Sequence, residues 1–365
     1  MARRKARRGR KIQPVPTTLT FDLGSTAPAS AGPGVTPTQQ TYYIDLSQCA
    51  SLVARKFLRQ GMVWGVSGMK LNSVNVVSGT DSPVADSPEG SIMVSKLPTS
   101  WVMSNAWEKS FRVWQRMNNE ALEEAESVKP KFLDFKVFMD SGHHQAGPSN
   151  NLLPVVGQQF AWTPASAGEW EYSKMIIPIT EPDAGAGTTA ERDLIAVGAS
   201  YPGTSAATGN NAVSLIEGYA ASRGLPDIRD PNTPDDADDT LGGTPENWMA
   251  ATFNEGIPQD HEVIEDMITE NNRAPYPFEN DGINADTMYP GGANQLAGVE
   301  VASIENITGS TVGGVTYLQG NTFPCGLIKI DVFNNDDTFD LYNVLQIELS
   351  PGPARGYMAL PMTEM

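Results

Sequence analysis

The sequence contains little cysteine, with only Cys49 and Cys325 among its 365 residues. Two cysteines so far apart provide neither a disulfide framework nor the closely spaced ligands of a zinc site. Free cysteines are commonly buried and behave as small apolar side chains. We therefore expect both thiols to be buried and unpaired.

Long apolar runs are missing as well. No segment approaches the run of roughly 18 apolar residues that a membrane-spanning helix requires. The basic residues at the N-terminus are followed by IQPVPTTLTFDLG, which lacks the apolar core of a signal peptide. The sequence therefore predicts a protein without a membrane segment.

Motifs for catalysis are also absent. The patterns H-E-x-x-H, G-x-S-x-G, G-x-x-x-x-G-K-[ST] and G-x-G-x-x-G do not occur. The three histidines are His143, His144 and His261. Because neighbouring side chains in a strand or loop point apart, we interpret His143 and His144 as a turn after a strand that ends at Asp140, not as a metal pair. We predict no enzymatic activity and no cofactor.

Negative charge is lacking before Asp22, whereas positive charge is concentrated there. Seven of the 25 Lys and Arg residues lie within residues 1–11. The rest of the chain contains the other 18 basic residues and all 43 Asp and Glu residues, so its net charge is −25. A block of like charge stays disordered until a polyanion neutralises it, and phosphates do so without sequence-specific contacts. We predict a nucleic-acid-binding arm formed by Arg3, Arg4, Lys5, Arg7, Arg8, Arg10 and Lys11.

The arm has other interpretations: a nuclear-localisation signal, a ribosome-type extension or an anchor to a membrane surface. The acidic body is expected to repel phosphates. The chain is thus predicted to consist of an arm that binds nucleic acid and a globular body that does not contact it.

The remaining sequence favours β structure. Its 34 Gly and 27 Pro suit many turns and long loops. Residues 12–40 are rich in Pro, Thr, Ser, Gly and Ala, and we predict a flexible linker there. Alternating or apolar segments typical of strands lie at residues 41–46, 62–77, 91–97, 130–140, 159–162, 170–179, 194–199, 213–219, 299–304, 315–318, 327–333 and 341–349.

One long helix is predicted, with Asn105 as its N-cap, Glu108 completing a capping box and Pro130 ending it. A shorter helix is predicted near residues 261–271. The apolar stripe of the long helix should anchor it to the core through Trp107, Phe111 and Trp114.

The segment KFLDFKVFMD, after the long helix, alternates with a period of two. We predict a strand that faces the core of the sandwich. One set of side chains should share that core with Ile328, Ile330 and Val332, namely Leu133, Phe135, Val137 and Met139.

Between about residues 181 and 298 the predicted strands thin out and polar loops dominate, which indicates either functional surface or strands that the pattern does not reveal. Two acidic runs stand out: Asp227, Asp230, Asp235, Asp236, Asp238 and Asp239, and then Asn334, Asn335, Asp336, Asp337 and Asp340. Neither fits an EF-hand loop. We expect solvated loops, with Ca²⁺ at subunit contacts as the alternative.

The short Arg-rich arm, the Pro/Thr/Ser linker and the many strands with long loops resemble single jelly-roll coat proteins of small icosahedral viruses. The segments PKFLDFKVFMDSGHH at 130–144 and FPCGLIKIDVFNN at 323–335 are most similar to coats of circular single-stranded DNA viruses, with nodavirus-like RNA virus coats as second choice. Some RNA-virus coats cleave themselves at an Asn near the C-terminus. The tail GYMALPMTEM has no Asn, so self-cleavage is not implied.

The resemblance implies an all-β fold: an eight-stranded antiparallel jelly-roll sandwich with long loops and one or two inserted helices. Residues 1–11 would be the arm, 12–40 the linker and 41–365 the shell domain, with loop insertions around 181–298. The implied function is a capsid protein that self-assembles into an icosahedral shell and packages its genome through the arm, with single-stranded DNA favoured over RNA. Its location would be the virion, and the host nucleus during assembly of a DNA virus.

Two other functions remain open at this stage. One is a cellular β-sandwich protein that binds nucleic acid or acts as a chaperone through a basic tail. The other is a β-rich carbohydrate-active enzyme that uses a pair of carboxylates. The size of the assembled protein separates these from a capsid, because only a capsid forms megadalton particles.

Overall fold

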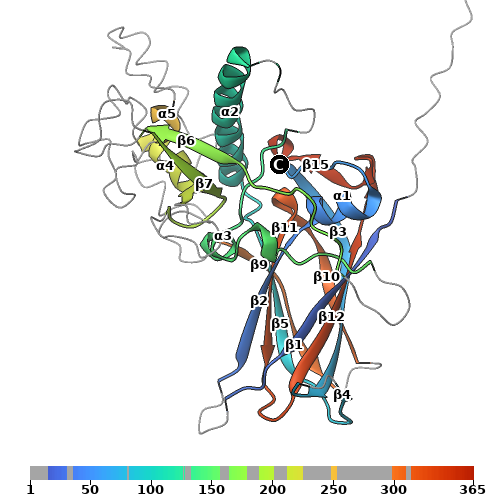
Figure 1. Cartoon of the computed structure of the whole chain (residues 1–365). Helices are drawn as coiled ribbons and strands as arrows, with labels where there is room; N and C mark the ends of the chain where they lie inside the picture. The colour runs from blue at the N-terminus through green and yellow to red at the C-terminus, as the bar shows by residue number, and fades with distance from the viewer. Residues whose placement is uncertain are drawn as a thin grey trace, which may run out of the picture.

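The structure, a computed structural model, describes residues 15–30, 36–79, 82–125, 127, 133–156, 164–178, 189–200, 212–224, 248–252, 298–309 and 314–365. Within these residues most of the regular structure is β-strand, arranged mainly in antiparallel sheets, with few helices. Two curled sheets face each other, and helices α2, α4 and α5 gather beyond one end of them (Figure 1).

The first sheet contains four long antiparallel strands in the order β1-β12-β3-β10. Their bounds are Thr18–Thr26 (β1), Asp340–Leu349 (β12), Met62–Val77 (β3) and Val315–Phe323 (β10). Two short strands pair with opposite ends of β3, namely β4 (Ser82–Pro83) and β15 (Ala359–Pro361).

The second sheet has the antiparallel order β2-β11-β5-β9. Its strands are Thr38–Asp45 (β2), Leu327–Asn334 (β11), Glu89–Lys96 (β5) and Glu300–Thr308 (β9). Across both sheets the pairs are nested along the chain: β1 with β12, β2 with β11, β3 with β10 and β5 with β9. The chain therefore doubles back on itself about the connection between β5 and β9.

The core between the two sheets is built from alternate residues, as the period of a strand requires. In β1 the buried positions are Leu19, Phe21 and Leu23, and in β11 they include Ile328, Ile330 and Val332. Trp64 and Tyr357 close one end of this core, with ring centroids 5.7 Å apart. The burial of Ile328, Ile330 and Val332 matches their predicted inward face.

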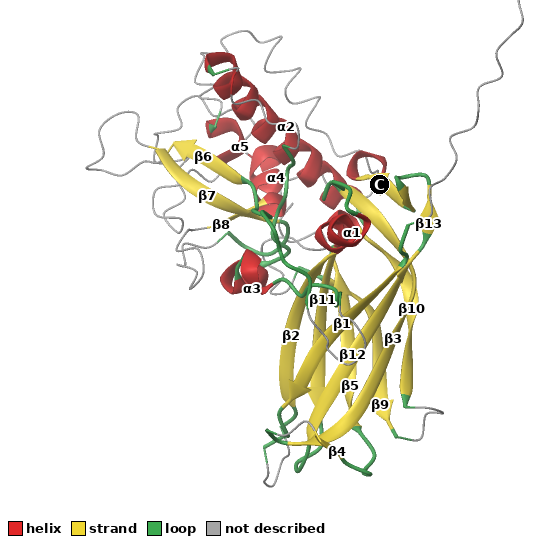
Figure 2. Ribbon diagram, turned by 45° about the vertical axis from the view of Figure 1, so that its right-hand side comes forward, coloured by secondary structure: helices red, strands yellow, loops and turns green. Residues whose placement is uncertain are grey.

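The long connection between β5 and β9 lies beyond one end of the two sheets (Figure 2). It supplies most of a second core, which Tyr43, Cys325, Leu327 and Met362 join from outside the connection. The helices of this insertion are α2 (Trp101–Glu124), α3 (Ser141–Ala146), α4 (Leu215–Gly224) and α5 (Trp248–Ala251), with a 3-10 turn at Pro148–Asn150. Its strands are β6 (Lys174–Pro178), β7 (Thr189–Ile195) and β8 (Ala212–Ser214), of which β7 and β8 run parallel. The predicted run of loops over 181–298 is therefore interrupted by β7, β8, α4 and α5.

Short elements gather at the same end of the sandwich as the insertion. They are α1 (Leu46–Ala54), β13 (Pro351–Gly352), β14 (Gly356–Tyr357) and the 3-10 turns at Pro324–Gly326 and Met362–Glu364. Asp45 caps α1 by accepting hydrogen bonds from the backbone N–H groups of Ser47 and Gln48. Both cysteines lie here, and their burial as free thiols confirms that expectation.

The predicted linker over 12–40 was wrong in part, because residues 18–26 form strand β1 and β2 already begins at Thr38. The segment TLTFDLGST places Leu19, Phe21 and Leu23 on one face, and this face packs into the sandwich. Averaging composition over the Pro- and Ser-rich neighbours hid this short period-two pattern.

The long helix begins five residues earlier than predicted. Ser100, not Asn105, is its N-cap and accepts a hydrogen bond from the N–H of Met103 at 3.3 Å. The helix ends at Glu124, ahead of Pro130. The aromatic stripe does anchor the helix, since Trp107 and Trp114 are buried and the partly buried Phe111 packs against them. It was expected to pack against the sandwich, however, and it joins a different core from that of Ile328.

The segment after this helix was placed against the wrong core. Residues 133–137 belong to no strand, and Phe138 makes only an isolated parallel bridge to Ile195. Phe135, Val137 and Met139 do share one face, with Leu133 packed beside them, but they join the second core and not that of Ile328. A period of two shows which side chains of a segment share one face. It does not show which other part of the protein packs against that face.

The predicted strand at 213–219 is a strand only as far as Ser214, after which α4 begins. Ser214 Oγ accepts a hydrogen bond from the N–H of Glu217 at 3.4 Å, which starts the helix. Short apolar runs do not distinguish a buried helix from a strand. The predicted helix near 261–271 and the predicted strand at 159–162 lie outside the described residues.

Candidate nucleic-acid interface

The seven basic residues of the predicted arm lie outside the described residues, but the structure locates the point where they join the body. The backbone carbonyl of Pro16 accepts a hydrogen bond from Tyr357 Oη at 2.8 Å, and that of Thr17 accepts one from the N–H of Leu349 at 2.8 Å. Val15 packs over Gly356, where a Cβ would overlap its side chain. The described chain therefore begins beside the β13–β14 hairpin.

A cleft of about 1560 Å³ opens next to this hairpin. Its walls come from four separate parts of the chain: residues 56–62 before and at the start of β3, helix α2, residues 133–135, and the C-terminal residues 352–361. The segment preceding β3 must pass close to α2, because Trp107 occupies the space that a Cβ on Gly61 would need. The cleft therefore lies where the sandwich meets the inserted helix.

The floor of the cleft is aromatic. The rings of Trp107 and Phe111 stack with centroids 5.1 Å apart, and Trp114 and Phe135 complete the cluster at 5.4 Å from each other. Phe57 stands apart from this cluster at the other side of the cleft, with its ring half-buried. The floor offers apolar surface that is held rigid by packing.

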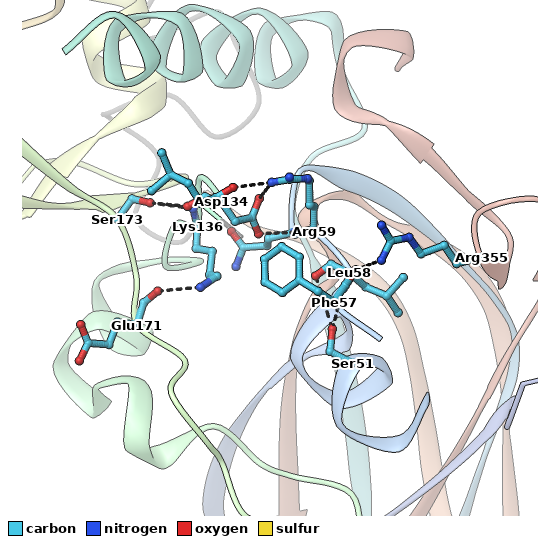
Figure 3. Close-up of polar contacts among 11 residues, drawn as sticks. Ser51, Phe57, Leu58, Arg59, Asp134, Lys136, Glu171, Ser173 and Arg355 are labelled. Carbon is cyan, nitrogen blue, oxygen red and sulfur yellow. Dashed lines mark hydrogen bonds and ion pairs between the residues drawn. The ribbon is translucent and has the colours of Figure 1, made fainter. Parts of the chain in front are cut away.

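The rim of the cleft is basic (Figure 3). Arg59 and Arg355 donate hydrogen bonds to the backbone carbonyls of Leu133 and Phe57, and Lys56 Nζ lies 3.5 Å from the carbonyl oxygen of Arg355. The Arg59 guanidinium also lies 5.5 Å from the centroid of the Phe57 ring. Carbonyl partners fix the direction of these side chains without neutralising their charge.

One carboxylate belongs to the cleft. Asp134 lies 3.8 Å from Arg59 Nη1, and its side chain is only 5% exposed. Burial raises the pKa of Asp134 from its ordinary value of 3.8 to about 6, against the opposing effects of the N–H of Gln60 and the charges of Lys136 and Arg59. The described charged residues that line the cleft are thus three cations and one weak acid, whereas the chain beyond residue 11 has a net charge of −25.

Beneath the cleft, Gln60 ties α1 to the insertion. Its side chain donates hydrogen bonds to Asp45 Oδ2 at 3.0 Å and to the carbonyl of Val137 at 3.1 Å, and accepts one from the N–H of Val137 at 2.6 Å. Trp170 donates a further hydrogen bond to Asp45. Burial raises the pKa of Asp45 above its ordinary range. This network holds the wall of the cleft in place.

His143 and His144 lie in helix α3, whose N-cap is Asp140, and not in a simple turn. His143 accepts a hydrogen bond from the N–H of Met139 at 3.0 Å and contacts Asn151 Oδ1 at 2.8 Å, while His144 contacts Asp193 Oδ2 at 2.7 Å. Burial lowers the pKa of His143 from 6.5 to about 4. Both rings are parts of a buried network, and His261 lies outside the described residues.

The second acidic run forms the turn between β11 and β12. Asp336 Oδ1 accepts hydrogen bonds from the N–H groups of Thr338 and Phe339, and Asn334 bonds to neighbouring backbone. In the part of the chain that the structure describes, no three His, Cys, Asp or Glu side chains gather as metal ligands do. The run from Asp227 to Asp239 lies outside that part.

Replacing Asp134 with Asn is expected to make the protein more sensitive to acid. The folded state holds a proton on Asp134 up to about pH 6, so this group adds stability at low pH and loses that contribution as the pH rises through 6. His143 has the opposite effect on stability. Its buried ring stays neutral in the folded state, so the stability it contributes is lost as the pH falls from 6.5 towards 4.

In the native protein, the stability gained as Asp134 takes up a proton offsets the stability lost because His143 resists protonation. D134N removes the gain from Asp134 and keeps the loss from His143. Its free energy of unfolding should fall by about 2 kcal/mol more than that of the parent between about pH 7 and about pH 4.5. Urea denaturation at the two pH values measures this difference. Equal acid sensitivity in both proteins would contradict the raised pKa of Asp134.

No family model, no curated protein and no solved structure matches the chain. Among the described residues no helix has both the length and the apolar character needed to cross a membrane. The site must therefore be interpreted from its own geometry. Sequence patterns did not reveal the cleft, since its four segments are far apart in the chain and only Lys56, Phe57 and Arg59 form a local basic and aromatic cluster.

Proposed function

We propose that the protein is a viral capsid protein that self-assembles into a closed icosahedral shell and packages a nucleic acid through its basic arm. The observation that carries the proposal is the nested pairing of the eight long strands. The first strand pairs with the eighth, the second with the seventh, the third with the sixth and the fourth with the fifth. Such pairing is what an eight-stranded jelly roll requires, and jelly rolls are used by viral capsids, lectins and cupins.

The separation of charge favours the capsid among these functions. Residues 1–11 carry seven cations, whereas the rest of the chain carries a net charge of −25. An arm of this kind binds phosphates with release of counterions, while the acidic body resists collapse onto the polyanion. Within this proposal the genome is single-stranded, with DNA favoured over RNA, and the protein resides in the virion and, during assembly of a DNA virus, in the host nucleus.

Edges of the two sheets supply surfaces for assembly. β9 and β10 lie at sheet edges next to each other, and they expose Val301, Ile304 and Tyr317. Unpaired sheet edges and exposed apolar side chains are common sites of contact between copies of a chain. Repetition of such contacts by symmetry closes a shell.

The proposal is tested by sedimentation of the purified protein followed by nuclease treatment. Shell assembly predicts megadalton particles whose nucleic acid resists nuclease until the particles are disrupted. Digestion of the released material with DNase or RNase then identifies the genome. A protein that remains a 39.2 kDa species at every salt concentration and pH would contradict the proposal.

A further inference from the structure

A cleft lined mostly by basic charged residues lies in the acidic body, near Val15, where the described chain begins. Among the described residues, Lys56, Arg59 and Arg355 provide three cations on the rim of the cleft, and Asp134 is the only anion that lines it. The lining therefore carries a net charge of +2 when Asp134 is ionised and +3 when it is protonated, in a body of net charge −25. This local reversal of charge fits a polyanionic ligand.

The size of the cleft leaves room for more than one nucleotide. Its volume of about 1560 Å³ exceeds the range of roughly 300–1,000 Å³ that is typical of small-molecule pockets. It also begins at the β13–β14 hairpin, against which Val15 and Pro16 are held. A nucleic acid bound by the arm is therefore brought to the mouth of the cleft.

The cleft also offers aromatic and apolar surface, which a purely electrostatic binding surface lacks. Across the cleft from the floor, the half-buried Phe57 ring lies near Arg59 and Arg355 (Figure 3), with the Arg59 guanidinium 5.5 Å and the Trp170 ring centroid 6.4 Å from its own centroid. Phe111 and Leu122 extend the apolar surface on the side of α2. Single-stranded nucleic acids bind where a positive groove follows the backbone and aromatic or guanidinium planes stack on the bases.

From these observations we propose that the cleft is a second nucleic-acid site, which binds unpaired nucleotides delivered by the arm. It rests on the proposed function, because the arm supplies the strand. Lys56, Arg59 and Arg355 contact phosphates, and Phe57 stacks on a base. A base pair has no unstacked face to offer, so the site selects single strands over duplexes. Protonation of Asp134 below about pH 6 strengthens binding, since it removes the one negative charge of the lining.

The test uses protein that lacks residues 2–11, so that the arm does not mask the cleft. Its affinity for a fluorescent oligothymidine is measured at low salt. K56Q/R59Q/R355Q is compared with K70Q/K174Q/R192Q, which removes the same number of cations outside the cleft. The cleft variant should lose at least about tenfold in affinity and reduce the log–log salt slope by about two, from roughly 0.7 per lost phosphate contact. The control should change affinity less than about threefold.

Stacking is tested separately with Phe57→Ala and an oligonucleotide of abasic residues. The variant should bind oligothymidine about tenfold more weakly than the arm-deleted parent does, yet bind the abasic strand equally well. Equal losses in the cleft and control triple variants, or no binding by the arm-deleted parent, would overturn this inference. If the full-length protein still forms particles that protect nucleic acid, such a result leaves the proposed function standing. Failure of the full-length protein to assemble would count against the proposed function instead.

Discussion

Deletion of residues 2–11 is expected to abolish packaging of nucleic acid while leaving both sheets folded. The deleted segment carries seven cations and no residue of either core, because the buried positions of β1 begin at Leu19. Each phosphate that is neutralised on a single strand contributes roughly 0.7 to the log–log salt slope, so seven contacts contribute at most about five. The log–log salt slope of the full-length protein should therefore be steeper than that of the deletion variant by at most about five.

The control for this deletion is its melting temperature, which should equal that of the full-length protein. Binding through the arm should also vary little with base sequence, since phosphate contacts carry no sequence information. Filter binding over a salt series measures both quantities. Packaging that survives the deletion unchanged would show that the body suffices to package the genome without the arm, and the role assigned to the seven basic residues would be wrong.

Phe21→Ala is expected to have the largest effect on stability among single substitutions near the N-terminus. Phe21 is fully buried between the sheets, where it packs in the same core as Leu345 and Ile347 of the protein's long C-terminal strand β12. Truncating a buried Phe removes apolar contacts and leaves a cavity, which costs about 3–5 kcal/mol. Chemical denaturation should show this loss, and assembly should fail at temperatures that the parent tolerates.

Thr20→Ala is the matched control, because Thr20 neighbours Phe21 in β1 but is only partly buried. It should change the free energy of unfolding by less than about 1 kcal/mol. A small effect of Phe21→Ala, equal to that of the control, would mean that residues 18–26 do not pack as a strand.

The central strands of the sandwich were predictable because each has a regular pattern of its own. β3 was predicted at its observed bounds of Met62–Val77, and the observed β12 begins one residue before the predicted segment. β1 was missed although Leu19, Phe21 and Leu23 alternate, because its Thr- and Gly-rich surroundings have the composition of a linker. Local composition does not show whether a distant strand such as β12 is available for pairing.

Predictions that depend on tertiary contacts were less successful. The inward face of Phe135, Val137 and Met139 was predicted correctly, but the layer that covers it was not, because the insertion forms a core of its own. The cleft was not visible for the same reason: Arg59 and Arg355 lie far apart in the sequence and line the same cleft only because of the fold. The arm was conspicuous in the sequence because charge segregation requires no tertiary structure.

A cryo-electron-microscopy reconstruction of the assembled protein tests the central claim most directly. The account predicts a closed shell with icosahedral symmetry, in which Val15 and the β13–β14 hairpin of every copy face the lumen, so that the arm and the cleft meet the packaged nucleic acid. Open aggregates, or a closed shell in which this end of the sandwich points outward, would contradict the account.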